Sequence, residues 1–210
     1  MNAKRQPYEI VEVALSHSQS VRRYSNTKKL PAIEHEGKFV SDSTDIAYYL
    51  EKTFPDRPLI PSDDKLWAKC HLYEDWADES LNFYMMKLRW LPQNRRRWAK
   101  ALAKEDSGIR RWLVDRLVAA ATLNILDKQG IGRKSESQIV CDLNRHLKAL
   151  SIDLRDGEFL LGDDLSLADI SVYVQLYWMA ENPEGRAIVE QYSSVVQWMG
   201  RVDTATQRVV

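Results

Sequence analysis

The sequence predicts a mostly helical protein that begins with a short α+β segment. Apolar residues make up 44% and charged residues 29% of the 210 residues, the composition of an ordinary globular protein. Only 8 glycines and 7 prolines occur, which are few for a turn-rich all-β chain. After about residue 62, apolar residues recur every three or four positions, and this spacing is typical of amphipathic helices.

The first 60 residues carry the predicted β structure. Tyr8–Val13 alternates between apolar and polar residues and is rich in β-branched side chains, which predicts a strand. Ala32–His35 and Lys38–Val40 flank Glu36-Gly37, which predicts a hairpin with glycine at its turn. A helix is expected to open near Asp42. It carries four apolar residues on one side: Ile46, Tyr49, Leu50 and Phe54.

A proline-rich stretch separates this segment from the rest of the chain. Three prolines lie between positions 55 and 61, and proline cannot continue a helix. We therefore predict one domain over residues 1–61 and an all-helical domain over residues 62–210. The helices expected there are 66–88, ending before Pro92, then 109–124, ending near Gly130, then 139–150, 166–179 and 188–202.

Composition excludes several classes of protein. The chain has 30 basic and 30 acidic residues, which argues against a polycation built to hold nucleic acid. The sequence contains no apolar run of 18 residues, so it predicts no membrane-spanning helix. Its polar start lacks the apolar centre of a secretory signal, and we therefore expect a cytoplasmic protein. Cys70 and Cys141 are expected to be reduced helix fillers. The histidines lie on separate segments and predict no metal site: His17, His35, His71 and His146.

Three motifs in this order resemble the cytosolic glutathione transferases. They are Leu30-Pro31-Ala32-Ile33, the run 42–46 followed by Phe54-Pro55, and the run 159–170 before an apolar helix. The resemblance implies an incomplete thioredoxin-like half followed by an all-helical half. It also implies a homodimer that uses glutathione and a small electrophile as substrates, without a metal. Gly132-Arg133 and the Trp-rich helix are similar, more weakly, to the metaxin-like and failed-axon-like branch.

The resemblance also implies which residues hold glutathione. In the family the proline at position 31 is cis, so the backbone of Leu30 can pair with the cysteinyl part of glutathione. The alternative is a trans proline that merely starts a strand. Ser43 would bind the γ-glutamyl carboxylate at a helix N-terminus, and Asp42 would meet the ammonium group. The alternative is that either residue is only the helix N-cap.

The remaining candidates are a helix cap, a substrate pocket and a set of tryptophans. Ser166 and Asp169 have the spacing of a capping box, to which we assign a structural role. Tyr84, Trp90 and Leu91 are the candidate substrate pocket by family analogy, but they are equally good core residues. The tryptophans have helical spacing that suits packing better than stacking on bases: Trp67, Trp76, Trp90, Trp98 and Trp112.

A basic run at Arg95-Arg96-Arg97 has further cations around it. It could bind RNA or an acidic protein, but a solvated helix face is favoured because the net charge is zero, so nucleic acid is not an expected partner. The acidic residues of 74–79 could instead face this run across a subunit boundary.

No residue of this sequence matches the catalytic position of the family. In the family, a loop between the first strand and the first helix supplies a Tyr, Ser or Cys that engages the glutathione sulfur. Residues 1–8 indicate a last helical turn, then Pro7, then the start of the second strand at Tyr8. We therefore expect the first strand, most of the first helix and the catalytic residue to be absent. We name no catalytic residue and expect weak glutathione contacts with little conjugation. Whether the chain is an enzyme stays open, leaning towards a transferase; the alternative is a non-catalytic interaction or dimerisation module.

Overall fold

The computed structural model describes residues 1–14, 21, 24–25 and 30–207. It divides into two compact units, one of residues 1–58 with 96–119 and one of residues 59–95 with 120–210. The first break lies within the proline-rich stretch, whereas residues 96–119 group with the N-terminal segment. A domain boundary at residue 61 stays a prediction. These described residues are mostly helical and contain one small sheet, as the sequence predicts.

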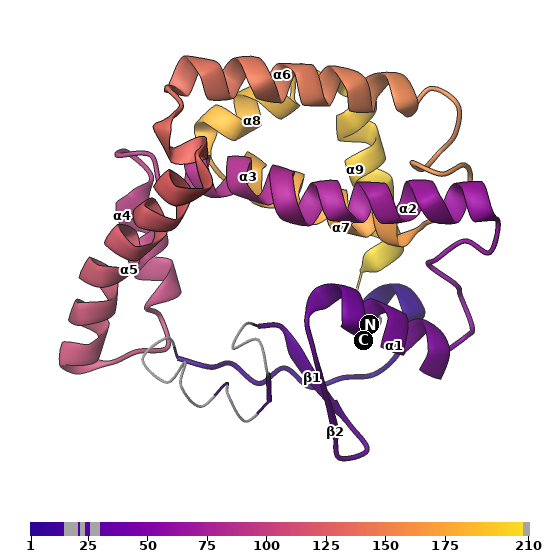
Figure 1. Cartoon of the computed structure of the whole chain (residues 1–210), viewed down its shortest axis with the longest axis horizontal. Coiled ribbons are helices and arrows are strands. Elements are labelled where there is room, and N and C mark those ends of the chain that lie inside the picture. Colours follow the sequence, from indigo (N-terminus) through magenta and orange to yellow (C-terminus); the bar gives the residue numbers. More distant parts are fainter. Residues whose placement is uncertain (15–20, 22–23, 26–29, 208–210) are drawn as a thin grey trace. The chain divides into compact units, whose positions relative to one another are not determined.

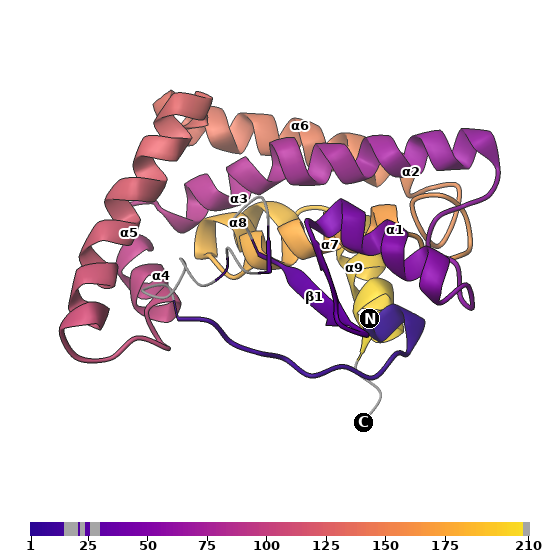
Figure 2. The same ribbon diagram turned by 60° about the horizontal axis from the view of Figure 1, so that its bottom comes forward.

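A two-stranded hairpin forms the sheet of the first unit. Strands β1 (Ala32–His35) and β2 (Lys38–Ser41) are antiparallel. Glu36 and Gly37 have φ angles of 51° and 76°, and two positive φ angles define the tight turn that suits the twist of a hairpin. The expected hairpin is confirmed. Helix α1 (Ser43–Thr53) follows directly and packs against both strands (Figures 1 and 2).

The expected strand at Tyr8–Val13 is wrong. These residues follow a short 3-10 helix, η1 (Asn2–Lys4), and form no strand. Ile10 and Val11 are 64% and 83% exposed. An alternating sequence becomes a strand only where a neighbour accepts its backbone hydrogen bonds, and the sheet of the described residues contains only β1 and β2. The alternation predicted a strand but could not show whether a neighbouring strand is present.

A buried lysine ties the N-terminal turn to the far end of α1. Lys4 is 2% exposed, and its ammonium lies 2.7 Å from the carboxylate of Glu51. The same ammonium donates to the carbonyl oxygens of Phe54 at 2.8 Å and Arg57 at 3.2 Å. A cation at a helix C-terminus is favoured by the helix dipole, so Lys4 both neutralises a partly buried acid and caps α1.

Among the described residues, the second unit contains a central apolar helix, α7 (Leu167–Ala180), together with six other helical segments and one short 3-10 turn besides the end of α5. The segments are α2 (Asp64–Trp76), the π-helical stretch η3 (Ala77–Leu81), α3 (Asn82–Arg89), η4 (Ile131–Arg133), α6 (Glu136–Asp153), α8 (Pro183–Val189) and α9 (Ser193–Thr206). Helix α7 contacts α2, α3, α8 and α9 (Figure 1). Val172, Leu176 and Met179 are fully buried along it. The helices expected at 66–88, 139–150 and 166–179 are confirmed, the first with a π-helical stretch inside it.

The single helix expected over 188–202 is wrong, because two helices cover this range. Helix α8 ends at Val189, and Tyr192, which precedes α9, has the non-helical angles φ −115° and ψ 86°. The Tyr192 hydroxyl donates to the backbone oxygen of Asn144 at 2.9 Å. Apolar residues continue through the break because both helices face the same core, so their spacing does not reveal it. Gly185 allows α8 to approach α7, since a Cβ there would lie 2.1 Å from the oxygen of Met179.

Two helices carry the sequence between α3 and η4. Helix α4 (Arg95–Leu102) is followed by α5 (Gly108–Gln129), which confirms the helix expected over 109–124. The apolar spacing of α5 does not produce a buried face. Ile109, Leu113 and Leu117 are 75%, 43% and 62% exposed, whereas Leu126 near the other end is fully buried.

Candidate functional site

The open end of the β1–β2 hairpin brings together the residues to which the sequence assigns glutathione binding. Ala32 in β1 pairs with Ser41 in β2. The residues preceding Ala32 and those following Ser41 therefore lie at the same end of the hairpin, since paired residues of antiparallel strands lie about 4.5–5.5 Å apart. Leu30-Pro31 enters at this end, and Asp42-Ser43 leaves it to begin α1.

Asp42 is the N-cap of α1. Its carboxylate accepts a hydrogen bond from the backbone N–H of Thr44 at 3.1 Å, and its carbonyl accepts the first helical bond from Ile46. Ser43 is the first helical residue and is exposed. The two residues therefore differ in role. One oxygen of Asp42 caps the helix, whereas Ser43 lies within its first turn, at the positive end of the helix dipole.

The backbone of Asp42 is strained. Its φ of 82° and ψ of 134° fall in a region that residues with a Cβ rarely adopt, at a cost of roughly 1–3 kcal/mol. Such strain persists only where the surrounding structure requires it, and here the chain must turn from the last residue of β2 into α1. Strained residues of this kind cluster at functional sites.

The Leu30–Pro31 peptide bond is cis. Leu30 is 56% exposed, so its side chain is not part of the core. Pro31 is exposed too and stands directly before β1. The trans alternative for Pro31 is thereby excluded, whereas the role of Leu30 and Pro31 towards glutathione stays a prediction.

The three residues of the candidate substrate pocket lie in the second unit and are buried. Tyr84 is in α3, and Trp90 and Leu91 follow its end; they are 8%, 4% and 7% exposed. A cavity of about 300 Å³ among the described residues lies elsewhere, in the first unit, lined by Lys100, Ala103, Gly108, Arg111 and Trp112. The substrate role of the first three residues stays a prediction.

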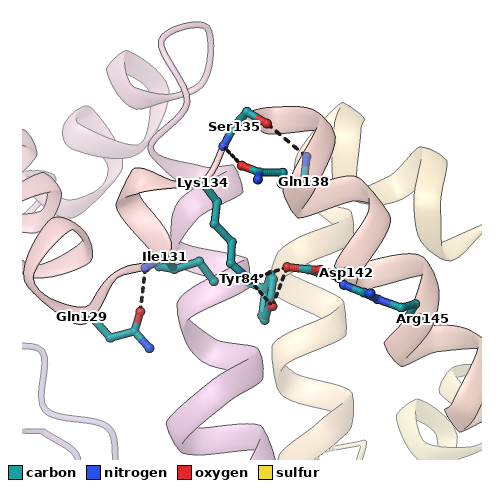
Figure 3. A network of polar contacts seen from close by, with 8 residues as sticks. All are labelled: Tyr84, Gln129, Ile131, Lys134, Ser135, Gln138, Asp142 and Arg145. Carbon is teal, nitrogen blue, oxygen red and sulfur yellow. Dashed lines mark hydrogen bonds and ion pairs between the residues drawn. The ribbon is translucent and has the colours of Figure 1, made fainter.

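Tyr84 belongs to a polar network that sequence reasoning missed (Figure 3). Its hydroxyl donates to Asp142 at 3.0 Å, and Lys134 donates to the same carboxylate at 2.5 Å. Arg145 pairs with the other carboxylate oxygen. The hydrogen bond from Lys134 lowers the pKa of Asp142 to about 2, and burial raises the pKa of Tyr84. No motif predicts this network, because α3, the turn after η4 and α6 meet only in the folded chain.

Ser166 and Asp169 lie at the start of α7 in a buried polar cluster. One oxygen of Asp169 accepts from the backbone N–H of Ser166 at 2.9 Å and from its hydroxyl at 2.6 Å. The other accepts from the backbone N–H of Leu160 and from the indole N–H of Trp198, both at 2.8 Å. The carboxylate therefore joins α7 to the preceding loop and to α9. Its arrangement suits a structural part of the fold, since all these groups are buried.

Two further expectations concern metals and membranes. The described residues contain no group of His, Cys, Asp and Glu that could hold a metal ion, and His17 lies outside them. Among the helices of the described residues, none is both long and apolar enough to cross a membrane.

Comparison with protein families finds two matching models. Residues 1–58 match "Glutathione S-transferase, N-terminal domain", and residues 140–201 match "Glutathione S-transferase, C-terminal domain". Together they match more than half of the chain, in the order expected for this family. The first match contains Leu30, Pro31, Asp42 and Ser43, and the second contains Ser166 and Asp169.

Individual relatives cover most of the chain. A "Probable glutathione S-transferase" of Nicotiana tabacum is 24% identical over 197 residues, which span 91% of this chain and 70% of that protein. The "Isoprene-epoxide--glutathione S-transferase" of Rhodococcus sp. (strain AD45) is 28% identical over 183 residues, which span 83% and 76%. The crystal structure of beta-etherase LigF from Sphingobium sp. strain SYK-6 has a TM-score of 0.68 at 21% identity, over 96% of this chain and 86% of that one.

Proposed function

Since this chain belongs to the glutathione S-transferase family, we propose that it binds glutathione at the open end of the β1–β2 hairpin. Where the catalytic loop of the family is present, it would conjugate or exchange glutathione with a small electrophile; without that loop we expect little activity. One observation carries the proposal. The register that pairs Ala32 with Ser41 supports a joint role for Leu30-Pro31 and Asp42-Ser43, the residues assigned to glutathione.

Each of these residues suits a different part of glutathione. The backbone of Leu30 would pair with the cysteinyl part as a short added strand. The hydroxyl and N–H of Ser43 would hold the γ-glutamyl carboxylate, because the start of a helix offers backbone donors and a favourable dipole. The oxygen of Asp42 that does not accept from Thr44 would receive the ammonium group.

The chemistry proposed is attack by the glutathione sulfur on an electrophilic carbon. The thiolate is the nucleophile, and a free thiol has a pKa of about 8.5, so family members lower this value with a nearby donor. No residue of this chain is assigned that role. The second substrate would bind near Tyr84, Trp90 and Leu91. An epoxide is a suitable first electrophile to test, because the Rhodococcus relative is named for one.

Glutathione binding tests the proposal directly. Titration calorimetry with glutathione should give measurable binding. Ser43→Ala should raise the dissociation constant about 10- to 150-fold, because a hydrogen bond to a charged group contributes about 1.5–3 kcal/mol. Ser193→Ala is the matched control, since Ser193 is the exposed first residue of α9, and it should bind as the unmodified protein does. Equal binding by Ser43→Ala, or no binding at all, would contradict the proposed site.

A conjugation assay separates the enzyme from the interaction module. Product formed from glutathione and an epoxide or a chloronitrobenzene supports the transferase, and glutathione binding without any product supports the non-catalytic alternative. The expected homodimer, the cytoplasmic location and the metaxin-like branch stay predictions.

A further inference from the structure

The helical hairpin of residues 96–117, here called the basic hairpin, concentrates positive charge and lies entirely within the first unit. It consists of most of α4, the turn after it and the first part of α5 (Figure 1). Seven of the 30 basic residues of the chain lie within it, against three of the 30 acidic residues. The basic hairpin therefore carries an excess of four positive charges in a chain with no net charge, and its surface attracts anions.

Three of these cations have no acidic partner. Arg96, Lys100 and Arg111 are exposed, and no acidic side chain that the structure describes lies within 4.0 Å of their charged groups. Lys104 differs from them, because its ammonium lies 3.6 Å from the carboxylates of Glu12 and Glu105. The three cations are therefore available to anions outside the chain.

The first turns of α5 present an apolar face to the solvent. Ile109, Trp112, Leu113 and Leu117 have the spacing i, i+3, i+4 and i+8, which places them on one side of a helix. These side chains are 75%, 54%, 43% and 62% exposed, so the described residues leave this face open. Removing such side chains from water is favourable, and an open apolar face of this kind marks an interaction surface.

Arginine side chains border this apolar face. The guanidinium of Arg116 lies 5.0 Å from the centre of the Trp112 ring, and Arg110 follows Ile109 at the edge of the face. Long cationic side chains can lay their aliphatic stems on an apolar layer while their charged ends reach a polar one. Tryptophan also suits such a boundary, since it combines an apolar ring with a polar N–H. This combination is typical of helices that lie in the surface of a membrane.

A cavity of about 300 Å³ adjoins the apolar face. Lys100 of α4 and Arg111 and Trp112 of α5 contribute to its lining. Two cations beside one cavity suit a phosphate group, with which lysine and arginine form charge-assisted hydrogen bonds. The neighbouring indole can contact the apolar chains that such a phosphate carries in a phospholipid.

We propose that the basic hairpin binds the surface of a membrane that contains anionic phospholipids. The apolar face of α5 lies among the headgroups, and Lys100 and Arg111 contact lipid phosphates. A helix of this kind lies in the plane of the interface and does not span the bilayer. Anionic headgroups attract clustered lysine and arginine side chains, and burial of apolar side chains then holds the contact. This binding uses no residue assigned to glutathione.

A lipid surface fits these observations better than a nucleic acid or an acidic protein. The phosphates of RNA can neutralise the cations, but an RNA backbone leaves Ile109, Leu113 and Leu117 in water. An acidic amphipathic helix docks in an apolar groove, whereas the cavity of the basic hairpin has a volume of only about 300 Å³. A bilayer is fluid, so it adapts to side chains that project separately from a helix.

Flotation with lipid vesicles tests the proposal on the full-length protein. Vesicles of phosphatidylcholine with about one quarter phosphatidylglycerol should bind the protein at least tenfold more tightly than phosphatidylcholine alone, because several cations act together. Lys100→Gln with Arg111→Gln should weaken binding to the anionic vesicles about 30-fold, since each cation near such a surface strengthens binding about fivefold. Ile109→Ser with Leu117→Ser should weaken it about 100-fold, about tenfold for each apolar side chain lost from the contact.

The matched controls change exposed residues of the same types in the second unit. Lys148→Gln with Arg155→Gln removes two exposed cations. Leu72→Ser with Ile152→Ser removes two apolar side chains that are 69% and 46% exposed. Both control variants should bind the anionic vesicles as the unmodified protein does.

Brominated lipids test the contact without a charge or serine variant. Bromine on the acyl chains quenches the fluorescence of an indole that reaches them. Vesicles with brominated anionic lipid should quench the unmodified protein, and Trp112→Phe should remove most of this quenching. Trp67→Phe, at a tryptophan of the second unit that is 44% exposed, should leave it unchanged.

Several results would overturn the proposal. They are no binding to the anionic vesicles, equal binding to the neutral ones, equal losses in the control variants, and quenching that Trp112→Phe retains. A protein that binds RNA or an acidic protein through the basic hairpin, but no vesicles, would overturn it as well.

Discussion

Replacement of Asp169 by alanine should destabilise the protein severely. Asp169 is fully buried and accepts four hydrogen bonds from three residues that are themselves buried: Leu160, Ser166 and Trp198. The variant leaves two backbone N–H groups and one indole N–H without their acceptor, and each orphaned buried group costs about 1–3 kcal/mol. Relief of the buried charge offsets part of this cost, so we expect a loss of about 3–5 kcal/mol, out of about 5–15 kcal/mol for a typical domain.

Urea unfolding followed by circular dichroism and tryptophan fluorescence measures the loss. Asp169→Asn should lose about half as much, because an amide oxygen can still accept from one pair of donors whereas the amide NH2 cannot. The Trp198 indole should lose its fixed environment, seen as a weaker near-ultraviolet dichroism. Asp163→Ala, at an exposed acid, serves as the control and should change stability by less than about 0.5 kcal/mol. A loss below about 1 kcal/mol for Asp169→Ala would refute the reasoning.

Two further predictions concern ion pairs. Lys4→Met should lower the unfolding free energy by about 3–5 kcal/mol, because the largely buried carboxylate of Glu51 loses its cation. Lys52→Met, at an exposed lysine, is the control and should change the unfolding free energy little. Equal effects of the two substitutions in thermal unfolding would count against this role of Lys4. The pKa of Asp142 is lowered from 3.8 to about 2, so ionised Asp142 stabilises the fold above about pH 4 and this stabilisation disappears as the pH falls through about 2. The stability difference between the unmodified protein and Asp142→Asn should be constant from about pH 5 to 7 and shrink in acid, and a difference that grows in acid would be the wrong sign.

Structure that depends on neighbouring residues could be predicted from the sequence. The turn at Glu36-Gly37 and the start of α1 after Asp42 involve groups only a few positions apart, so the residue types determine the geometry. The capping spacing of Ser166 and Asp169 is equally local. Family resemblance added the assignment of glutathione to Leu30, Pro31, Asp42 and Ser43, which still awaits a binding measurement.

Apolar spacing was a poorer guide, because it does not say what lies opposite. Tyr8–Val13 has the alternation of a strand, yet the sheet of the described residues contains only β1 and β2. The regular spacing of Ile109, Leu113 and Leu117 suggested a buried face, yet all three are exposed. The same spacing runs through the break at Tyr192, since α8 and α9 face one core. In each case the pattern records which positions are apolar but not what lies opposite them, and two of the three expected conformations were wrong as a result.

The sequence by itself determined that this chain is mostly helical, where its hairpin turns, and where the helices α1 and α7 begin. Only the tertiary structure decided which polar groups meet: Lys4 with Glu51, Lys134 with Asp142, and Asp169 with Trp198. Local structure follows from dihedral preferences and from hydrogen bonds within a few residues. Contacts between residues 8 to 47 positions apart in the chain form only once burial has brought the elements together, and no short sequence pattern records them.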